Sequence, residues 1–328
     1  MTEPLSAEEL AWATDRIQAV TSHFDATVVG QRRLRTALLA TLLGEGHILV
    51  ESVPGLAKTL AASTLAHAFD ASFARIQCTP DLLPSDIIGT EVFDPSTASF
   101  HTELGPVHAN FVLLDEINRS SAKTQAAMLE AMQERQTSIG GTSHPLPDPF
   151  VVMATQNPID EEGTYVLPQA QMDRFLLKEV IDYPSPDDEL EVLGRIERGE
   201  LDEPDPAVAS TDDIARLRSA TRRVHVEEAL KRYVIQVVDV TRHPDDHLPS
   251  HTARWIQVGA SPRASIAFLR VARAHALLEG RDHVTTDDVL ALRHAILRHR
   301  IVLTFEALAE HVPVDSIVDA VFDRVPTP

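Results

Sequence analysis

The chain has 328 residues, of which 44% are hydrophobic and 24% charged, a composition typical of a globular protein with room for two domains. Its 29 basic and 49 acidic residues give a net charge of −20, and that field repels nucleic-acid backbones and anionic membranes. We therefore expect no nucleic-acid partner.

The N-terminal residues carry no basic start followed by an apolar core, so no signal peptide is expected. No uncharged apolar run is long enough for a membrane span, which argues against membrane insertion. The single cysteine, Cys78, excludes an internal disulfide and is typical of a reducing compartment. It lies in an apolar-leaning strand candidate, which favours a buried structural thiol. Together these features predict a cytoplasmic protein.

The first half of the chain alternates between helical and strand-like segments. Amphipathic spacing predicts a helix over 6–23, and a second helix follows "VVGQ" (28–31). Apolar strand candidates lie at 47–51, 73–77, 111–115, 150–155 and 175–181, and helical segments lie at 58–69 and 121–135. Continuous apolar strands separated by helices indicate an α/β domain whose parallel sheet is covered on both faces.

Two stretches interrupt this alternation. Residues 80–110 are too long for a plain loop between a helix and a strand, so we expect structure within them. Residues 136–146, "QTSIGGTSHPL", place a Gly-Gly pair between short β-prone runs, which predicts a tight hairpin.

Beyond residue 184 the pattern becomes helical. Helices are expected at 186–198, 211–224, 226–241, 262–279, 285–300 and near 315–323. The sequence thus predicts an α/β domain over 1–184 and an all-helical domain over 185–328.

The stretch "ESVPGLAKTL" (51–60) partly matches the phosphate-binding pattern G-x-x-x-x-G-K-[ST]. Lys58 and Thr59 fit the pattern, but Ser52 and Ala57 occupy its two glycine positions and only Gly55 remains. We expect a right-handed backbone at Ala57, which tolerates a methyl group. A β-carbon at Ser52 is the more serious departure, because it restricts the turn. Alone, this match fits an ordinary strand-to-helix turn equally well.

Polar residues at two other strand ends favour the phosphate-binding interpretation. Asp115 and Glu116 end the apolar run "FVLLDE", and Asn157 follows the strand "FVVMAT". A solvated strand end would explain the acids by themselves. In open α/β sheets, however, ligands bind where the carboxyl ends of the strands converge. We expect Thr59 and Asp115 to hold Mg²⁺, and Glu116 to orient and deprotonate the attacking water.

These motifs resemble the MoxR family of AAA+ ATPases, in the branch that carries an insert in helix 2. The matching segments are "VVGQ", "VPGLAKT", "PDLLPSDIIGTEVFD", "LLDEINRSSAKTQAAMLEAMQERQ", "ATQNPIDEEGTYVLPQAQMDRFLLK" and "GASPRA", which span most of residues 28–300. The resemblance implies a P-loop AAA+ domain with an N-terminal helix and a helix-2 insert at about 80–110, followed by a smaller helical lid. The family expects a glycine at the position of Ser52, whereas Ala57 is usual in it.

The resemblance also implies a set of residue roles. Asn157 is similar to sensor 1, which positions the water. Arg174, in "MDRF", is similar to the arginine finger given to a neighbouring subunit, and Arg263, in "GASPRA", to sensor 2, which reaches from the lid to the γ-phosphate. ATP would contact Val29 and Gly30 through its adenine, and Pro54, Gly55, Leu56, Ala57, Lys58, Thr59 and Leu60 through its phosphates.

At the level of function, the family resemblance implies Mg²⁺-dependent ATP hydrolysis by a homo-oligomeric ring, expected to be a hexamer. It further implies chaperone-like remodelling or maturation of a client complex, with a von Willebrand factor A-type partner protein. Two alternatives stay open: a magnesium-chelatase-like motor, and a nucleotide-switched assembly module with slow turnover. A helicase is disfavoured because the hairpin at 136–146 carries no Lys or Arg.

The segment 243–254 departs from the family pattern as an apparent insertion. His243, His247 and His251 recur every four residues beside two aspartates, a spacing that raises the question of a metal site. Pro244 and Pro249 forbid one continuous helical face, so a solvated lid loop is the preferred interpretation.

Overall fold

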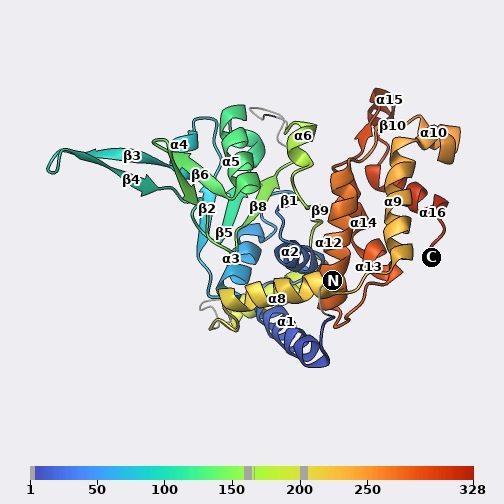
Figure 1. Ribbon diagram of the computed structural model, residues 1–328, viewed down its shortest axis with the longest axis horizontal. Helices are drawn as coiled ribbons and strands as arrows, with labels where there is room; N and C mark the ends of the chain where they lie inside the picture. The colour runs from blue at the N-terminus through green and yellow to red at the C-terminus, as the bar shows by residue number, and fades with distance from the viewer. Residues whose placement is uncertain (1–3, 159–164, 166, 200–205) are drawn as a thin grey trace.

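The computed structural model describes residues 4–158, 165, 167–199 and 206–328, and its centre is one parallel sheet (Figure 1). The five strands run in the order β2-β5-β8-β1-β9. Their bounds are β1 (Ile48–Glu51), β2 (Phe73–Gln77), β5 (Phe111–Asp115), β8 (Val151–Gln156) and β9 (Leu177–Val180). The predicted parallel α/β domain is confirmed, with each predicted strand present within two residues at either end.

Helices cover both faces of the sheet, because successive strand residues point to opposite sides and most of them are apolar. On one face, Leu49, Val112 and Val152 belong to a core completed by α5 (Ala122–Glu134). On the other face, Ile48, Val50 and their neighbours pack with three helices and with the lid. These three helices are α1 (Ala7–Thr27), α2 (Arg32–Leu43) and α3 (Lys58–Ala68).

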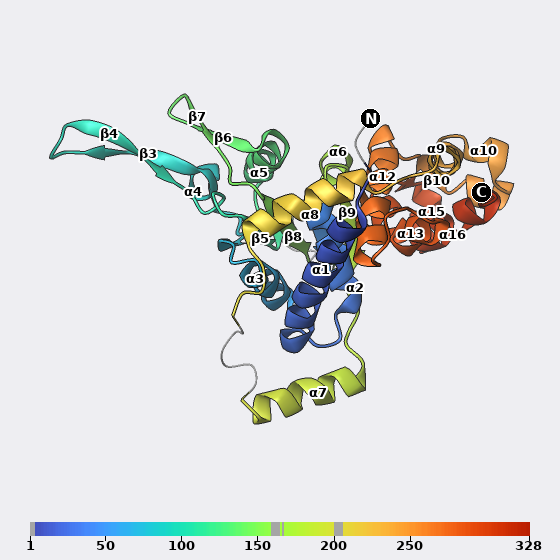
Figure 2. The same ribbon diagram turned by 60° about the horizontal axis from the view of Figure 1, so that its bottom comes forward.

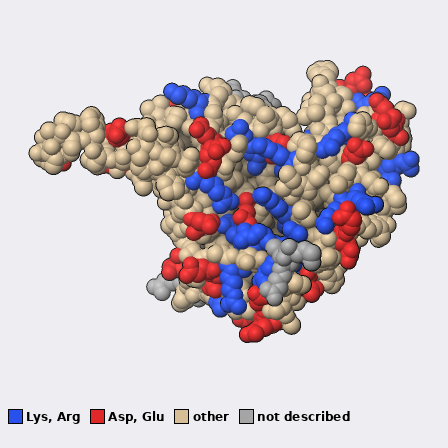
Figure 3. Space-filling model, in the orientation of Figure 1, with Lys and Arg blue, Asp and Glu red and all other residues tan. Residues whose placement is uncertain are grey.

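Two antiparallel hairpins extend from this domain, and both regions were expected to carry structure. Residues 80–110 form α4 (Pro84–Ile88), β3 (Gly89–Asp94) and β4 (Ser99–Leu104), and the β3–β4 arm projects far from the body (Figures 1 and 2). Figure 3 shows no Lys or Arg on this arm. The second hairpin joins β6 (Gln136–Ile139) to β7 (Thr142–Pro145) through Gly140 and Gly141, as predicted.

The C-terminal part is mainly helical, with small departures from the prediction. Its longer helices are α7 (Pro186–Glu197), α8 (Thr211–Arg223), α9 (Glu228–Arg242), α12 (Pro262–Leu278) and α16 (Val314–Arg324). The helix predicted over 285–300 is two helices, α13 (Thr286–Ala291) and α14 (Arg293–Leu297), and α15 (Phe305–Ala309) was not predicted. The domain is also not all-helical, because β10 (Ile256–Val258) pairs with β11 (Val302–Leu303).

The histidine-containing insertion is not a loop but two single helical turns, α10 (Pro244–His247) and α11 (Ser250–Ala253), each of which begins at or directly after a proline. His243 and His247 lie near the carboxylate of Asp239, at 3.2 and 4.0 Å, and His251 packs edge-on against Trp255. Among the described residues no group of three His, Cys, Asp or Glu side chains is arranged to hold a metal ion.

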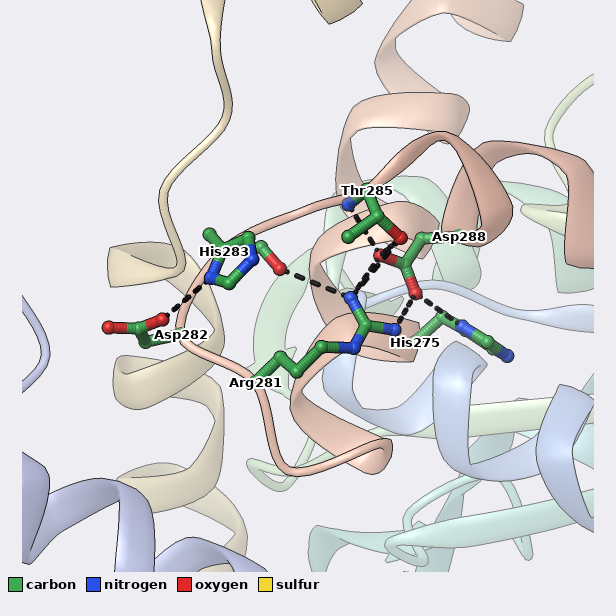
Figure 4. A network of polar contacts seen from close by, with 6 residues as sticks. All are labelled: His275, Arg281, Asp282, His283, Thr285 and Asp288. Atoms are coloured by element: carbon green, nitrogen blue, oxygen red, sulfur yellow. Dashed lines mark hydrogen bonds and ion pairs between the residues drawn. The ribbon is translucent and has the colours of Figure 1, made fainter.

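A buried polar cluster fixes the turn between α12 and α13 (Figure 4). Asp288, which is fully buried, accepts hydrogen bonds from two nitrogens of Arg281 at 2.6 Å and lies 2.7 Å from Nδ1 of His275. It also caps the start of α13 through Thr285. Burial opposes ionisation of Asp288, yet these hydrogen bonds hold its pKa well below the ordinary value. The cluster therefore holds α13 against α12 as a charged, fully bonded unit.

The boundary between the two parts is less sharp than the sequence suggests. α8 packs against α1 and α2 as well as against α12, and one continuous hydrophobic core joins the sheet domain to the lid. Within the described residues, no helix is long and apolar enough to cross a membrane.

Candidate nucleotide-binding site

The turn between β1 and α3 has the backbone that a phosphate cradle needs, but one residue in it differs from our expectation. Gly55 has φ +86°, and Ala57 has φ +52° and ψ +24°. Our prediction of a right-handed backbone at Ala57 was wrong. The left-handed region costs an alanine roughly 1–2 kcal/mol, and here the turn imposes it so that α3 begins at Lys58.

Ser52, the other non-glycine position, needs no unusual backbone. Its φ is not positive, its N–H donates to the carbonyl of Gln156 at 3.2 Å, and its side chain is buried. The residue thus continues the pairing of β1 with β8, and its β-carbon fits the turn without strain.

The turn presents several unpaired backbone donors. Within the described part of the chain, the N–H groups of Gly55, Leu56 and Ala57 donate to no protein acceptor, and those of the first turn of α3 have no partner inside the helix. Nζ of Lys58 donates to the carbonyls of Val53 at 3.2 Å and Ser52 at 3.4 Å, so its side chain folds over the turn. Unpaired amides, a helix N-terminus and a cation together favour an anion with several oxygens.

Burial lowers the pKa of Lys58, while the carboxylates of Asp115 and Glu116 oppose that shift. The two acids follow directly at the end of β5, and Asp115 is buried. The structure therefore brings Lys58, Asp115 and Glu116, which the sequence assigned to one site, into electrostatic contact.

Two residues that the sequence did not identify hold the acids in place. Oδ2 of Asp115 accepts from Nη2 of Arg75 at 2.6 Å and from its Nε at 3.2 Å. The hydroxyl of Thr155 donates to Oδ1 of Asp115 at 2.7 Å and accepts the N–H of Glu116 at 2.9 Å. That N–H belongs to a residue with φ +58°, so the hydroxyl also stabilises the left-handed turn that aims Glu116 away from β5.

Glu116 itself lies near two further donors. Its Oε2 accepts from Nε2 of Gln77 at 3.2 Å and lies 3.2 Å from Nε of Arg119. Asn157, the predicted sensor 1, follows the end of β8 and is buried. Gln77, Glu116 and Asn157 thus come from the carboxyl ends of three adjacent strands, as the sequence predicted for Glu116 and Asn157.

The residues assigned to Mg²⁺ have the chemistry of a hard-cation site. Thr59 is the second residue of α3 and Asp115 ends β5, and they offer hydroxyl and carboxylate oxygens, the ligand types that Mg²⁺ prefers. Both oxygens of Asp115 already accept hydrogen bonds from Arg75 and Thr155. The donor set fits Mg²⁺, which Thr59 and Asp115 would hold.

Val29 and Gly30 line a separate cavity of about 540 Å³ together with the end of β9 and the start of α7. Gly30 has φ +74° and lies against Asp188 of α7 so closely that a β-carbon there would clash. The cavity lies at the end of β9, the strand next to β1, and has the volume of a small-ligand site.

The predicted arginine finger and sensor 2 lie together, but not beside Lys58. Arg174 and Arg263 line a cavity of about 670 Å³ with Arg270, Gly46 and His47. Gly46 and His47 precede β1, whereas the Lys58 turn follows it, so about 13 Å of strand separates the two sites. We call the cavity lined by Arg174, Arg263 and Arg270 the arginine pocket.

A short hydrogen-bonded chain fixes the two arginines relative to each other. Ser261 caps α12 by accepting the N–H of Arg263 at 3.1 Å and donates its hydroxyl to Asp173 at 2.8 Å. The other oxygen of Asp173 accepts from Nε of Arg300 at 3.0 Å, and Arg300 also donates to the carbonyl of Phe175. Burial lowers the pKa of Arg300 to about 10, against the attraction of Asp173. The residues next to Arg174 and Arg263 thus lock the lid to the sheet domain.

Comparisons with known proteins agree with this geometry. Residues 47–177 match the family described as "ATPase family associated with various cellular activities (AAA)", and residues 249–321 match the AAA lid domain. The fold and the site therefore define a AAA-type nucleotide-binding protein with a lid.

Three relatives narrow the class. The chain is 46% identical to the chaperone MoxR1 of Mycobacterium tuberculosis, over 99% of this chain and 86% of that protein. It is 42% identical to the uncharacterised protein YeaC of Bacillus subtilis, over 93% of each chain. A solved structure of a candidate ATPase from Cytophaga hutchinsonii superposes with a TM-score of 0.92 at 42% identity, covering 98% of this chain and 97% of that one. The chain belongs to the MoxR family of AAA+ ATPases.

Proposed function

We propose that this protein hydrolyses ATP with Mg²⁺ as a homo-oligomeric ring and uses the hydrolysis to remodel a partner protein complex. The observation that carries the proposal is the division of the catalytic groups between two places. Lys58, Asp115 and Glu116 lie at the carboxyl edge of the sheet, whereas Arg174 and Arg263 lie in the arginine pocket beyond the amino end of β1. One copy holds both halves of a phosphoryl-transfer site but keeps them apart.

In the first half, at the carboxyl edge of the sheet, the residues bind ATP and orient the attacking water. The amides of the turn and Lys58 hold the phosphates, and Val29 and Gly30 hold the adenine. Thr59 and Asp115 would hold Mg²⁺, which supplies positive charge against the phosphate oxygens. Glu116 accepts a proton from the attacking water, and Asn157 positions that water. Arg75 and Thr155 keep the two acids in place.

In the second half, the arginines supply charge to the site of a neighbouring copy. A head-to-tail arrangement places one copy's arginine pocket against the next copy's Lys58 turn, and such a contact closes into a ring when the rotation is right. Arg174 then acts as the finger. We assign Arg263 to the same neighbouring site, because it lies in the pocket with Arg174 and not above its own Lys58. A hexamer is the proposed size.

The remodelling role is supported by the relative named a chaperone and by the projecting β3–β4 arm. Phe93 and Phe100 pack together on this arm with ring centroids 5.2 Å apart, and both are exposed. Exposed aromatic residues on a protruding hairpin are suited to contact a client. A von Willebrand factor A-type partner and a cytoplasmic location are proposed from the family resemblance alone.

The two alternatives can be separated from this proposal by assay. A slow assembly switch would bind ATP and release phosphate at a rate close to zero in steady state. A magnesium-chelatase-like motor would support insertion of Mg²⁺ into a porphyrin when combined with the other chelatase subunits. The near-complete coverage of a relative named a chaperone favours remodelling.

Two substitutions test the central assignment. Lys58→Ala should abolish ATP binding, because the lysine charge acts on the phosphates of bound ATP. Glu116→Gln should keep ATP affinity and stop turnover, because the glutamate acts on the water. Isothermal titration with ATP and Mg²⁺, combined with phosphate release, measures both properties. Equal loss of ATP binding in the two variants would overturn the assignment.

A further inference from the structure

Helix α7 carries an apolar stripe that no part of the chain described by the structure covers. Leu190, Leu193 and Ile196 recur every third residue, and their exposed fractions are 69%, 59% and 60%. No residue of α7 is fully buried, and Figure 2 shows the ribbon of α7 at the bottom of the view, away from the lid helices. Three exposed aliphatic side chains on one helix form a surface that favours a protein partner.

The lid has an apolar groove of complementary character. It has a volume of about 250 Å³, and its walls come from α9, α12 and the start of α13, including Leu230, Ile235 and Phe268. Among the residues described, Lys231 is the only charged residue in its lining. Ile235 and Ile266 are exposed on its rim at 58% and 52%. We call this cavity the lid groove.

The two apolar surfaces cannot meet within one copy. α7 is held to the sheet domain near both of its ends, since Asp188 lies against Gly30 and Nη1 of Arg195 donates to the carbonyls of Asp25 and Ala26. The lid groove lies among α9, α12 and α13, away from α7 in Figure 2. Among the described residues neither surface covers the other, so a partner for each would come from another copy or another protein.

Each surface adjoins one half of the divided catalytic site. Asp188 and Arg195 of α7 line the cavity that contains Val29 and Gly30. Ile266 lines both the lid groove and the arginine pocket, one turn of α12 beyond Arg263. If the arginine pocket of one copy meets the nucleotide site of the next, the lid groove and α7 approach each other in the same contact.

Charge favours the same pairing. The residues of α7 include five acids and one arginine, and Glu189 and Glu197 lie beside the apolar stripe. On the groove side, Lys231 lies in the lining, 3.5 Å from Glu228 of its own helix. Arg263 and Arg270 line the adjoining arginine pocket and are exposed along α12, three residues before and four after Ile266. An amphipathic helix that enters an apolar groove is a common mode of protein recognition, and here its acids would face the exposed arginines of α12 next to the groove.

We infer that α7 of one copy docks into the lid groove of its neighbour, with Leu190, Leu193 and Ile196 buried in the groove. This inference rests on the proposed ring, and it gives that ring a contact outside the catalytic residues. Because the contact joins two different surfaces, it repeats from copy to copy in one direction. It also couples the adenine cavity of one copy to the lid helix that carries Arg263 in the next.

Cysteine cross-linking tests the contact directly. Burial raises the pKa of the Cys78 thiol to about 12, so the native cysteine does not react with a maleimide under ordinary conditions. Two single variants, Leu193→Cys and Ile235→Cys, are mixed with Mg²⁺ and a non-hydrolysable ATP analogue and treated with a short bismaleimide. The mixture should give a covalent dimer on a denaturing gel, whereas each variant alone should not.

The matched control is Leu308→Cys, which places an equally exposed cysteine on α15, outside the lid groove. The yield of covalent dimer from the 193–235 mixture should exceed that from the 193–308 mixture by at least about tenfold, because docking holds the two thiols at high effective concentration. Leu193→Glu should weaken ring assembly in native mass spectrometry, whereas Leu308→Glu should not.

The outcomes separate this inference from the proposed function. Rings that form and hydrolyse ATP without a 193–235 cross-link overturn the docking and leave the function intact. A cross-link between two Leu193→Cys copies overturns it in favour of α7 pairing with itself. A cysteine at position 235 that stays open to a bulky maleimide in assembled rings also overturns it and leaves the groove to a client. A 193–235 cross-link in rings that hydrolyse no ATP supports the docking and contradicts the function.

Discussion

Thr155 is the residue on which the geometry of both catalytic acids depends. One hydroxyl donates to Asp115 and accepts the N–H of Glu116. Thr155→Val keeps the shape but leaves the N–H of Glu116 without that acceptor, a loss of about 1–3 kcal/mol in the free energy of unfolding. We expect the ATP affinity to stay within about threefold of the native value and the turnover rate to fall at least about tenfold. A tenfold fall corresponds to a loss of only about 1.4 kcal/mol in stabilisation of the transition state.

The control for this change is Thr221→Val. Thr221 is also buried, but its hydroxyl donates only to the carbonyl of Leu217 in its own helix. Phosphate release and ATP titration should therefore match the native protein. If Thr155→Val turns over ATP as fast as Thr221→Val, the hydroxyl does not position Glu116.

His47 makes the stability of the fold depend on pH. Its Nδ1 accepts the N–H of Val152 at 3.0 Å, so the proton lies on Nε2 and is donated to the carbonyl of Met132. Burial lowers the pKa of His47 from its ordinary value of 6.5 to about 4. Between pH 6.5 and pH 4, His47 is therefore protonated in the unfolded chain but neutral in the folded one, which favours unfolding. The contribution of neutral His47 to the free energy of unfolding is complete above pH 6.5 and is lost as the pH falls toward 4.

From about pH 7.5 to about pH 5, this group alone should reduce the free energy of unfolding by about 2 kcal/mol. Urea unfolding at several pH values measures the slope, that is, how steeply the free energy of unfolding changes with pH. His47→Gln should flatten it even if the variant is less stable at neutral pH, whereas His101→Gln, at an exposed position on the hairpin arm, should not. An unchanged slope in His47→Gln would contradict the prediction. His299, whose pKa burial lowers well below its ordinary value, adds to the same trend.

At the scale of elements, the sequence predicted best what burial determines. The sheet strands are mostly apolar, and the central ones are buried on both faces, so the positions of all five were correct within two residues. Elements held by a few local contacts were missed, among them β10, β11 and the separation of α13 from α14 at Leu292. The left-handed Ala57 could not be predicted, because glycine is the usual sequence signal for that conformation.

The site was predicted in the same unequal way. Asp115, Glu116 and Lys58 stand in local motifs, and their neighbourhood follows from parallel strand ends. Arg75 and Thr155 were missed because their contacts depend on the register of neighbouring strands. Gln77 is opposite Asp115, which brings Arg75, two residues earlier on the same strand, near the Asp115 carboxylate. Leu114 is opposite Ala154, which places Thr155 beside Asp115. The separation of Arg174 and Arg263 from Lys58 is a property of topology, since β1 lies between them, and no motif contains that information.

Ser261 joins two elements, the start of α12 and the loop that carries Arg174. Ser261→Ala removes the N-cap of α12, which contributes about 0.5–2 kcal/mol to the free energy of unfolding. It also removes the hydrogen bond from Ser261 to Asp173. ATP binding at Lys58 should persist, because Ser261 lies on the arginine side. The rate of phosphate release should fall, since Arg174 and Arg263 lose their fixed spacing, and Ser261→Thr should restore it. The control is Ser210→Ala, which removes the cap of α8 without touching the arginine pocket. Equal rates in the two alanine variants would contradict the link.

The whole-molecule prediction concerns a site shared between copies. In a lone copy, Arg174 and Lys58 lie beyond opposite ends of β1, so a complete site needs a second copy. Specific activity should therefore rise with protein concentration. Arg174→Ala copies should bind ATP through their own Lys58 and Thr59 but fail to serve their neighbours. Glu116→Gln copies should fail at their own site yet still donate Arg174.

Mixed rings of these two variants, made by co-expression, should therefore recover activity that neither variant has alone. A complete site forms where an Arg174→Ala copy receives Arg174 from a Glu116→Gln neighbour, and random assembly makes this about a quarter of the junctions. The control pairs Arg174→Ala with a copy that carries both substitutions, because that ring contains no complete site. If native mass spectrometry shows mixed rings and phosphate release stays at the control level, either Arg174 acts within its own copy or turnover needs several intact sites. Native activity that does not depend on protein concentration would then support the first explanation and reject a shared site.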